Sequence, residues 1–169
     1  MGTFDQTELR SALGSFATGV TIITTRGADG RDYGLTANSF NSVSLDPPLV
    51  LWSLNRNSAS LAAFMASESF AVHVLAADQQ HLSNRFARKG EDKFAGLNLA
   101  RGLDGAPLLE GCAARFECRS RHRYEGGDHW IFVGEVAAFR HCHKPPLVFH
   151  GGRYEVLAGI GQREPALAV

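Results

Sequence analysis

Two short segments of the sequence concentrate hydroxyl and amide side chains suited to holding a ligand. The first is residues 36–39, Thr-Ala-Asn-Ser. Its short donors and acceptors, with adjacent backbone amides, match the edge of a planar heterocycle. The same residue types also form Asx or Ser turns that close a strand. The residues alone leave both interpretations open.

The second segment is residues 53–60, Ser-Leu-Asn-Arg-Asn-Ser-Ala-Ser, which runs from a strand into a helix start. The free N–H groups and positive dipole of a helix N-terminus favour phosphate. The guanidinium of Arg56 and the hydroxyls of Ser58 and Ser60 would complete an anion site. Ser58 also suits a plain helix cap without a ligand, but so many polar groups beside an arginine favour the ligand.

Metal and nucleophile chemistry find little support in the sequence. In His141-Cys142-His143, adjacent strand residues point to opposite faces, and no C-x-x-C or H-x-x-x-H pair is present. We therefore expect no metal site. Cys118 alternates with arginines and is interpreted as a small core residue. The glycine motifs of Rossmann and Walker sites and the G-x-S-x-G elbow are absent, so a nucleotide would not be held in a Rossmann turn.

Charge and length narrow the function classes further. The 169 residues carry 17 basic and 17 acidic side chains, which disfavours attraction to nucleic acid or an anionic membrane. Only Lys89, Lys93 and Lys144 are lysines, and the arginine bias leaves local anion sites open. Three cysteines, no leader pattern and no apolar run of about 18 residues predict a cytoplasmic protein with free thiols.

The elements that must position these residues are mostly strands. Patterning predicts short helices over 5–16 (capped by Thr3 or Asp5), from Ser58 through Met65, and from a cap at Asp78 through Phe86. Residues 88–111 are expected to form a loop with one short helical turn near Phe94. Strands are expected at 20–26, 33–40, 49–53, 70–75, 113–124, 130–139, 147–149 and 153–156. Regularly spaced short strands with few helices predict a mainly β fold, a barrel decorated by helices.

Four motifs in this order resemble those of the flavin reductase-like family, the reductase components of two-component flavin-dependent monooxygenases. They are residues 16–21 (FATGVT), 34–40 (GLTANSF), 42–50 (SVSLDPPLV) and 127–136 (GDHWIFVGEV). The resemblance runs from about Phe4 to Leu157. It implies a flavin-binding split β-barrel in a single domain, residues 1–157, followed by a loose tail, 158–169.

The resemblance also implies a function. The expected protein is an NAD(P)H:flavin oxidoreductase that transfers hydride from NADH or NADPH to FMN or FAD and supplies reduced flavin to a separate monooxygenase. Members are usually homodimers. Hydride transfer needs two rings stacked at close range rather than a protein acid or base. This agrees with the absence of paired carboxylates or a nucleophile.

The resemblance assigns site residues by position. The isoalloxazine is expected against Thr36, Ala37, Asn38 and Ser39. The ribityl chain and phosphate are expected against Ser53, Asn55, Arg56, Ser58 and Ser60, closed over by Arg85 and Phe86. The nicotinamide side is expected at His129, His150, Arg153 and Tyr154, with His129 as the catalytic residue that orients the carboxamide or stabilises charge.

Two alternative functions stay open, and the sequence departs from the family pattern at one place. A non-catalytic flavin carrier would share the fold but would not need His129, His150 and Tyr154. A pyridoxamine phosphate oxidase-like flavoenzyme would need a basic cradle for its substrate's phosphate. Some family members have a lysine or an Arg-Ser-Ser run where this chain has Asn55-Arg-Asn57. This leaves the choice between FMN and FAD open.

Overall fold

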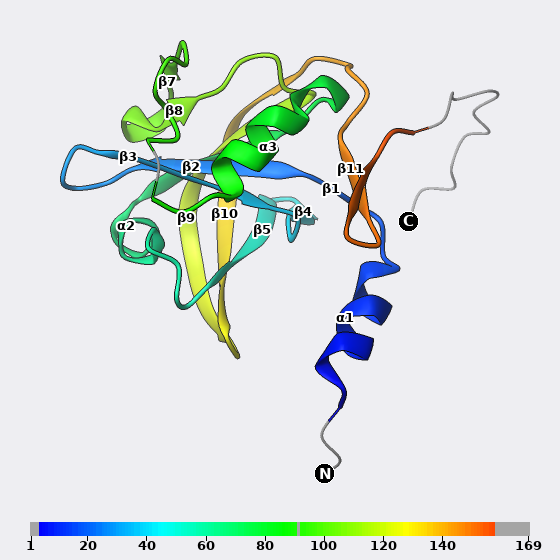
Figure 1. Cartoon of the computed structure of the whole chain (residues 1–169). Coiled ribbons are helices and arrows are strands. Elements are labelled where there is room, and N and C mark those ends of the chain that lie inside the picture. Colours follow the sequence, from blue (N-terminus) through cyan, green and yellow to red (C-terminus); the bar gives the residue numbers. More distant parts are fainter. Residues whose placement is uncertain (1–3, 91, 158–169) are drawn as a thin grey trace.

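The computed structural model describes residues 4–90 and 92–157, in which a curved sheet forms an open barrel with helices around it (Figure 1). The seven antiparallel strands run in the order β3-β2-β6-β9-β10-β5-β4. Strands β3 and β4 are the free edges, so the sheet curls without closing. This confirms the split β-barrel. The strands are β2 (Thr21–Arg26), β3 (Asp32–Ala37), β4 (Asn41–Leu45), β5 (Pro48–Asn55), β6 (Ser69–Val74), β9 (Ala114–Gly126) and β10 (His129–His141).

Smaller sheets flank the barrel. Strands β1 (Thr18–Gly19), β11 (Val148–His150) and β12 (Arg153–Glu155) form one of them, and this confirms the two last predicted strands. The segment predicted as a loop over 88–111 instead contains β7 (Ala100–Arg101), the 3₁₀ turn η2 (Leu103–Gly105) and β8 (Pro107–Leu108). The tail predicted for 158–169 lies outside the described residues, and the single-domain boundary stays a prediction.

Strand β2 separates two cores, which explains why its residues are β-branched almost throughout. Ile23 faces the barrel interior, whereas Ile22 faces a second core under α3 (Gln80–Ala87). Successive side chains of a strand point to opposite faces, so a strand buried on both sides needs compact side chains that pack well on each face, as β-branched residues do. This second core fixes α3 against the sheet beside the end of β3.

Aromatic rings fill the barrel interior. Trp52 of β5 stacks on Phe132 of β10 with centroids 4.7 Å apart, and Phe64 and Phe70 meet Trp52 edge-on. Cys118 is fully buried in this core, so its interpretation as a core residue is confirmed. Burial raises the pKa of its thiol to about 12. The thiol is therefore protonated at neutral pH.

The helices begin at other residues than the sequence indicated, except at the first. Asp5 caps α1 (Gln6–Gly14) by accepting the N–H groups of Thr7 and Glu8. The predicted Ser58 cap of α2 (Leu61–Ala66) is wrong, because the N-cap is Ser60 and Ser58 Oγ accepts the Ser60 N–H at 3.3 Å. The predicted Asp78 cap is also wrong: the turn η1 (Ala77–Gln79) precedes α3, whose cap is Gln79.

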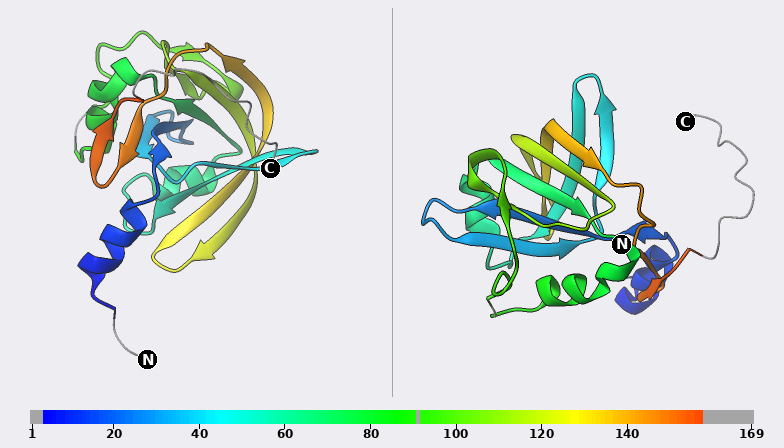
Figure 2. Two further views of the ribbon diagram at one scale, coloured as in Figure 1. Left: turned by 90° about the vertical axis from the view of Figure 1, so that its right-hand side faces the viewer. Right: turned by 90° about the horizontal axis from the view of Figure 1, so that it is seen from above.

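Two elements project from the barrel. Helix α1 leads away from it, and the β4–β5 hairpin extends beyond the sheet (Figures 1 and 2). No residue of α1 is buried. None of the described helices is long and apolar enough to cross a membrane.

Candidate functional site

A cavity of about 840 Å³ opens where the ends of β3 and β5, the start of β10 and the end of α3 meet. Its volume lies in the range of about 300–1,000 Å³ that is typical of small-molecule and cofactor sites. It brings together nine of the predicted site residues with others that the sequence did not single out. The lining residues are Leu35, Thr36, Ala37, Asn38, Ser53, Leu54, Asn55, Asn57, Ser58, Ala59, Ser60, Phe86, Ala87, Arg88, Lys89, Gly90, Lys93 and His129.

The end of β3 supplies one wall. Thr36 Oγ1 donates a hydrogen bond to the Ser83 carbonyl of α3 at 2.7 Å, which ties the strand to the helix. Asn38 is exposed, and no hydrogen bond of its side chain occurs among the described residues. Ser39 links two strands. Its Oγ accepts the Ser53 N–H at 2.9 Å, and so bridges the β3 segment to β5 across the opening of the barrel.

The segment after β5 supplies the second wall, and its polar residues line the cavity although Ser58 is not the cap of α2. Asn55 Oδ1 accepts the Asn57 N–H at 2.8 Å in an Asx turn. This turn and the Ser58–Ser60 hydrogen bond shape the backbone, while Asn55, Ser58 and Ser60 still line the cavity. The turn therefore positions these polar groups toward the cavity.

Three basic residues at the end of α3 line the cavity and were not predicted: Arg88, Lys89 and Lys93. Lys93 Nζ donates to the carbonyls of Gly34 at 3.1 Å and Phe86 at 2.8 Å. Burial lowers the pKa of its ammonium, and a bound anion would offset that desolvation. The only sequence signal was that three basic residues occur within six positions after the helix.

The two arginines predicted to meet phosphate make other contacts. Arg56 forms an ion pair with Glu125 at 3.0 Å and lies over the Trp130 ring. Arg85 donates to the carbonyls of Ala95 and Asp92. Neither is among the residues that line this cavity. Their flavin roles stay predictions, and the positive charge at the cavity comes from Arg88, Lys89 and Lys93.

His129 begins β10 and stands opposite Asn55 of β5 in the sheet register, on the rim of the cavity. Its Nδ1 lies 2.7 Å from Asp128 Oδ1. That hydrogen bond lowers the pKa of the Asp128 carboxyl. An ionised carboxylate at this place orients the imidazole through Nδ1 and leaves Nε2 for another partner.

A smaller cavity of about 220 Å³ adjoins the first and shares Thr36, Asn38 and Ala87 with it. Tyr154 lines it, with its hydroxyl 2.8 Å from Ser83 Oγ and 3.1 Å from Asn84 Oδ1. This holds the β11–β12 hairpin against α3. His150 and Arg153 pair within that hairpin and are exposed. The structure therefore brings Tyr154 to the site, but not these two.

The lining suits a phosphate-bearing planar ligand. The half-buried Leu35 and the exposed Ala59 and Ala87 offer apolar surface for a ring. Hydroxyls and amides offer hydrogen bonds to its edge, and three cations offer charge for a phosphate. Among the described residues no group of three or more His, Cys, Asp or Glu side chains could hold a metal ion. An open barrel with such a cavity defines the class of flavin-binding split-barrel proteins.

The chain belongs to the flavin reductase-like family, because its residues 13–158 match the "Flavin reductase like domain". It is 48% identical over 145 residues to FMN reductase (NADH) SmoA of Agrobacterium fabrum, which covers 86% of this chain and 82% of that protein. It is 43% identical over 147 residues to the reductase component of the flavin-dependent trigonelline monooxygenase of Acinetobacter baylyi. That match covers 87% of this chain but only 47% of the longer relative.

Solved structures agree with the fold. The NADH:FAD oxidoreductase SgcE6 of Streptomyces globisporus, crystallised with NAD and FAD fragments, superposes with a TM-score of 0.88 at 39% identity. The match covers 94% of this chain and 96% of that one.

Proposed function

We propose that the protein is an NADH:flavin oxidoreductase that reduces FMN or FAD and releases reduced flavin to a separate oxygenase. The observation that carries the proposal is the single cavity in which the end of β3, the turn after β5, three cations and His129 meet. The names of the relatives, an FMN reductase (NADH) and a monooxygenase reductase component, support the same activity.

We assign the parts of the cavity by their chemistry. Thr36, Asn38 and the backbone at Ala37 hold the edge of the isoalloxazine. Ser53, Asn55, Ser58 and Ser60 hold the ribityl chain, and Arg88, Lys89 and Lys93 meet the phosphate. When bound, flavin supplies the acceptor for a hydride from C4 of the reduced nicotinamide. The protein contributes alignment of the two rings and exclusion of water.

His129 and Tyr154 form the nicotinamide side in this proposal. His129 Nε2 faces the ligand because Asp128 holds Nδ1, so it orients the carboxamide or offsets negative charge on the product. Tyr154 lies in the adjoining cavity, beside Thr36 and Asn38. A pure flavin carrier would not need either group.

A steady-state assay tests the activity. Purified protein, NADH and FMN or FAD are mixed, and the loss of the nicotinamide absorbance is followed. The proposal expects NADH oxidation that requires both protein and flavin. Binding of flavin without NADH oxidation would instead identify a carrier, and the reductase assignment would then be wrong.

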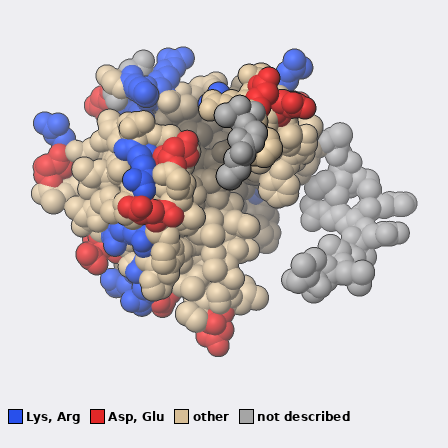
Figure 3. Space-filling view, turned by 90° about the horizontal axis from the view of Figure 1, so that it is seen from below, with Lys and Arg blue, Asp and Glu red and all other residues tan. Residues whose placement is uncertain are grey.

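We also propose a homodimer, supported by apolar surface on the projecting elements. In α1 and the residues after it, Leu13 is 67% and Phe16 78% exposed, and Leu45 of the β4–β5 hairpin is 94% exposed. Such exposure on elements that leave the body is typical of interfaces. The face seen from below in Figure 3 is largely uncharged near its centre, with acidic and basic groups mixed along the left side and others at the upper right and bottom edge.

We also propose a cytoplasmic location, because the cysteine thiols are free. Cys112, Cys118 and Cys142 are all free, and the first two are buried. Reduced cysteines of this kind are typical of a reducing compartment.

A further inference from the structure

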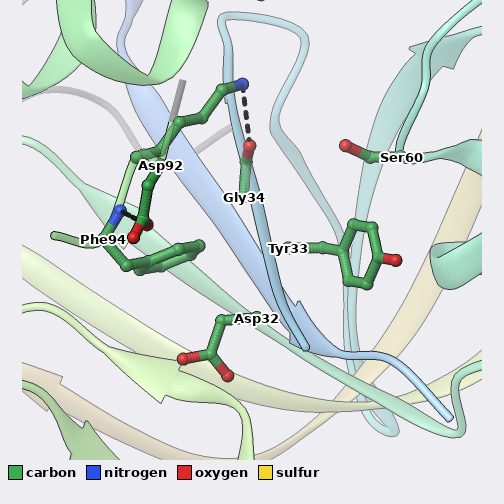
Figure 4. Close-up of a pocket in the computed structure, with 7 residues that line it drawn as sticks. Asp32, Tyr33, Gly34, Ser60, Asp92 and Phe94 are labelled. Carbon is green, nitrogen blue, oxygen red and sulfur yellow. Dashed lines mark hydrogen bonds between the residues drawn. The ribbon is translucent and has the colours of Figure 1, made fainter. Parts of the chain in front are cut away.

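The main cavity continues past Lys93 along the free edge of β3. A depression of about 200 Å³ there shares Ser60 and Lys93 with the main cavity (Figure 4). A larger one of about 640 Å³ shares Asp32, Asp92 and Phe94 with that depression. The two depressions together are called the edge groove. Its lining residues are Arg31, Asp32, Tyr33, Gly34, Ser60, Asp92, Lys93, Phe94, Ala95 and Leu99.

Lys93 stands at the junction between the main cavity and the edge groove. Its ammonium has three N–H donors, and the carbonyls of Gly34 and Phe86 take two of them. The remaining donor and the charge are available to an anion at the boundary. A ligand that ends in one phosphate would stop here, whereas a diphosphate would continue into the groove.

The walls beyond Lys93 suit a nucleoside. The half-buried Phe94 ring lines both depressions and packs edge-on against Phe86, with centroids 5.0 Å apart. Figure 4 shows the Phe94 ring on one side of Gly34 and the Tyr33 ring on the other. A flat aromatic surface of this kind stacks on a nucleobase whichever base it is.

Two carboxylates line the groove, and they differ in what they leave for a ligand. Asp32 is paired with Arg26 at 3.0 Å and Arg101 at 2.6 Å. Asp92 is exposed, and within the described part of the chain its carboxylate accepts only the Phe94 N–H, at 3.1 Å. A carboxylate placed beside an aromatic wall can accept hydrogen bonds from ribose hydroxyls, as acidic residues do in other dinucleotide sites.

We propose that the edge groove binds the adenosine monophosphate half of FAD, and that the protein therefore binds FAD more tightly than FMN. This inference rests on the proposed flavin site. A nicotinamide dinucleotide also carries an adenosine half, but the groove joins the cavity at the cations assigned to the flavin phosphate. The adenine lies against Phe94 and the ribose against Asp92.

The test compares flavin affinities without NADH, by quenching of flavin fluorescence. Wild-type protein is expected to bind FAD more tightly than FMN. Phe94→Leu keeps apolar volume against Phe86 but removes the ring, and should weaken FAD binding about tenfold while FMN affinity stays within about twofold. Asp92→Asn should weaken FAD severalfold and leave FMN unchanged. Matched controls are Phe139→Leu and Asp78→Asn, both exposed and outside the groove.

Three outcomes would overturn the proposal. Equal affinity of the wild-type protein for FMN and FAD would do so, and so would an equal loss of both flavins in Phe94→Leu, which indicates a structural role. If Phe94→Leu increased the KM for NADH but left the ratio of FAD to FMN affinity unchanged, the groove would be assigned to the nicotinamide nucleotide. Since flavin binding is measured without turnover, absence of NADH oxidation would refute only the reductase function.

Discussion

At the scale of single residues, His129 separates catalysis from flavin binding. It lies on the cavity rim with Asp128 on its Nδ1, whereas the cations proposed to meet the phosphate follow α3. His129→Ala should lower kcat/KM for NADH by about tenfold to a hundredfold, in the range of a lost positioning group. FMN affinity should change little. Steady-state kinetics and fluorescence titration measure the two effects, with His81→Ala on the exposed side of α3 as the control.

Lys89 gives a second test at this scale, because no hydrogen bond or ion pair of its exposed side chain occurs among the described residues. Removal of its charge should weaken binding of a phosphate without disturbing the fold. Lys89→Gln should reduce FMN affinity about threefold to tenfold, as expected for one partly screened charge contact. Riboflavin, which lacks the phosphate, should bind both proteins equally. An equal loss for riboflavin would contradict the assignment of this end of the cavity to phosphate.

His73 makes folding stability depend on pH. The side chain is fully buried; Nδ1 donates to the Ile22 carbonyl at 3.0 Å and Nε2 accepts the Leu109 N–H at 3.1 Å. Burial lowers its pKa from 6.5 to about 4. The unfolded chain therefore binds the proton first as pH falls.

The stability that neutral His73 provides is complete above about pH 6.5 and is lost as pH falls toward about 4. The pKa difference corresponds to about 3 kcal/mol in the free energy of unfolding. Urea unfolding measured between these pH values checks the slope. In His73→Gln, which does not titrate, the slope should be smaller, and an unchanged slope would assign the effect to other groups.

At the scale of elements, the β9–β10 hairpin depends on a close approach at Gly134. A Cβ there would press on the Phe70 ring and would lie 3.0 Å from Cys118 Cβ. Gly134→Ala should destabilise the fold by about 1–3 kcal/mol, as for overpacked cores, and lower Tm in a thermal melt. Gly19→Ala is the matched control, since no described atom beyond the adjacent residues lies within 4 Å of its added Cβ. Equal Tm values for the two variants would contradict this packing.

The elements also show how far the sequence predicts the structure. The β-branched run at 20–26 and the alternating run from 113 predicted their strands, because burial on one or both faces leaves a local pattern. Strand β4 (Asn41–Leu45) was missed because it is short: Val43 and Leu45 alternate with serines, but both are exposed and mark no buried face. The helix caps at Ser58 and Asp78 were wrong because a turn precedes each helix: Ser58 Oγ accepts the Ser60 N–H before α2, and Asp78 lies inside the 3₁₀ turn before α3.

The candidate site was predicted in part. Residue types singled out residues 36–39 and 53–60, the resemblance added His129, and the fold brings Thr36, Asn38, Ser53, Asn55 and His129 together. The basic residues at the end of α3 were missed, because only the packing of that helix beside β3 places them at the cavity. Arg56 and Arg85 show the converse: their types suit phosphate, but the structure engages them in other contacts.

At the scale of the whole molecule, the exposed apolar residues of α1 and the β4–β5 hairpin predict self-association. Light scattering at micromolar concentration should give the mass of a dimer. Phe16→Asp should shift the equilibrium toward monomer while circular dichroism stays unchanged, because Phe16 is 78% exposed and outside both cores. Wild-type protein that scatters as a monomer would contradict the proposed dimer.

The balanced charge of the molecule agrees with how the proposed ligands are bound. With 17 basic and 17 acidic residues, the protein has no overall field to attract phosphates. Flavin and nicotinamide must therefore be recognised by local groups, and residues 88–93 supply the cations at the cavity.

Anaerobic mixing of the protein, flavin and NADH tests the central claim most directly, because without oxygen the electrons from NADH remain on the flavin. The account predicts rapid bleaching of the flavin absorbance, in equal molar amount with the NADH consumed, and much slower bleaching with His129→Ala. Flavin that binds the protein but is bleached no faster than free flavin would contradict it.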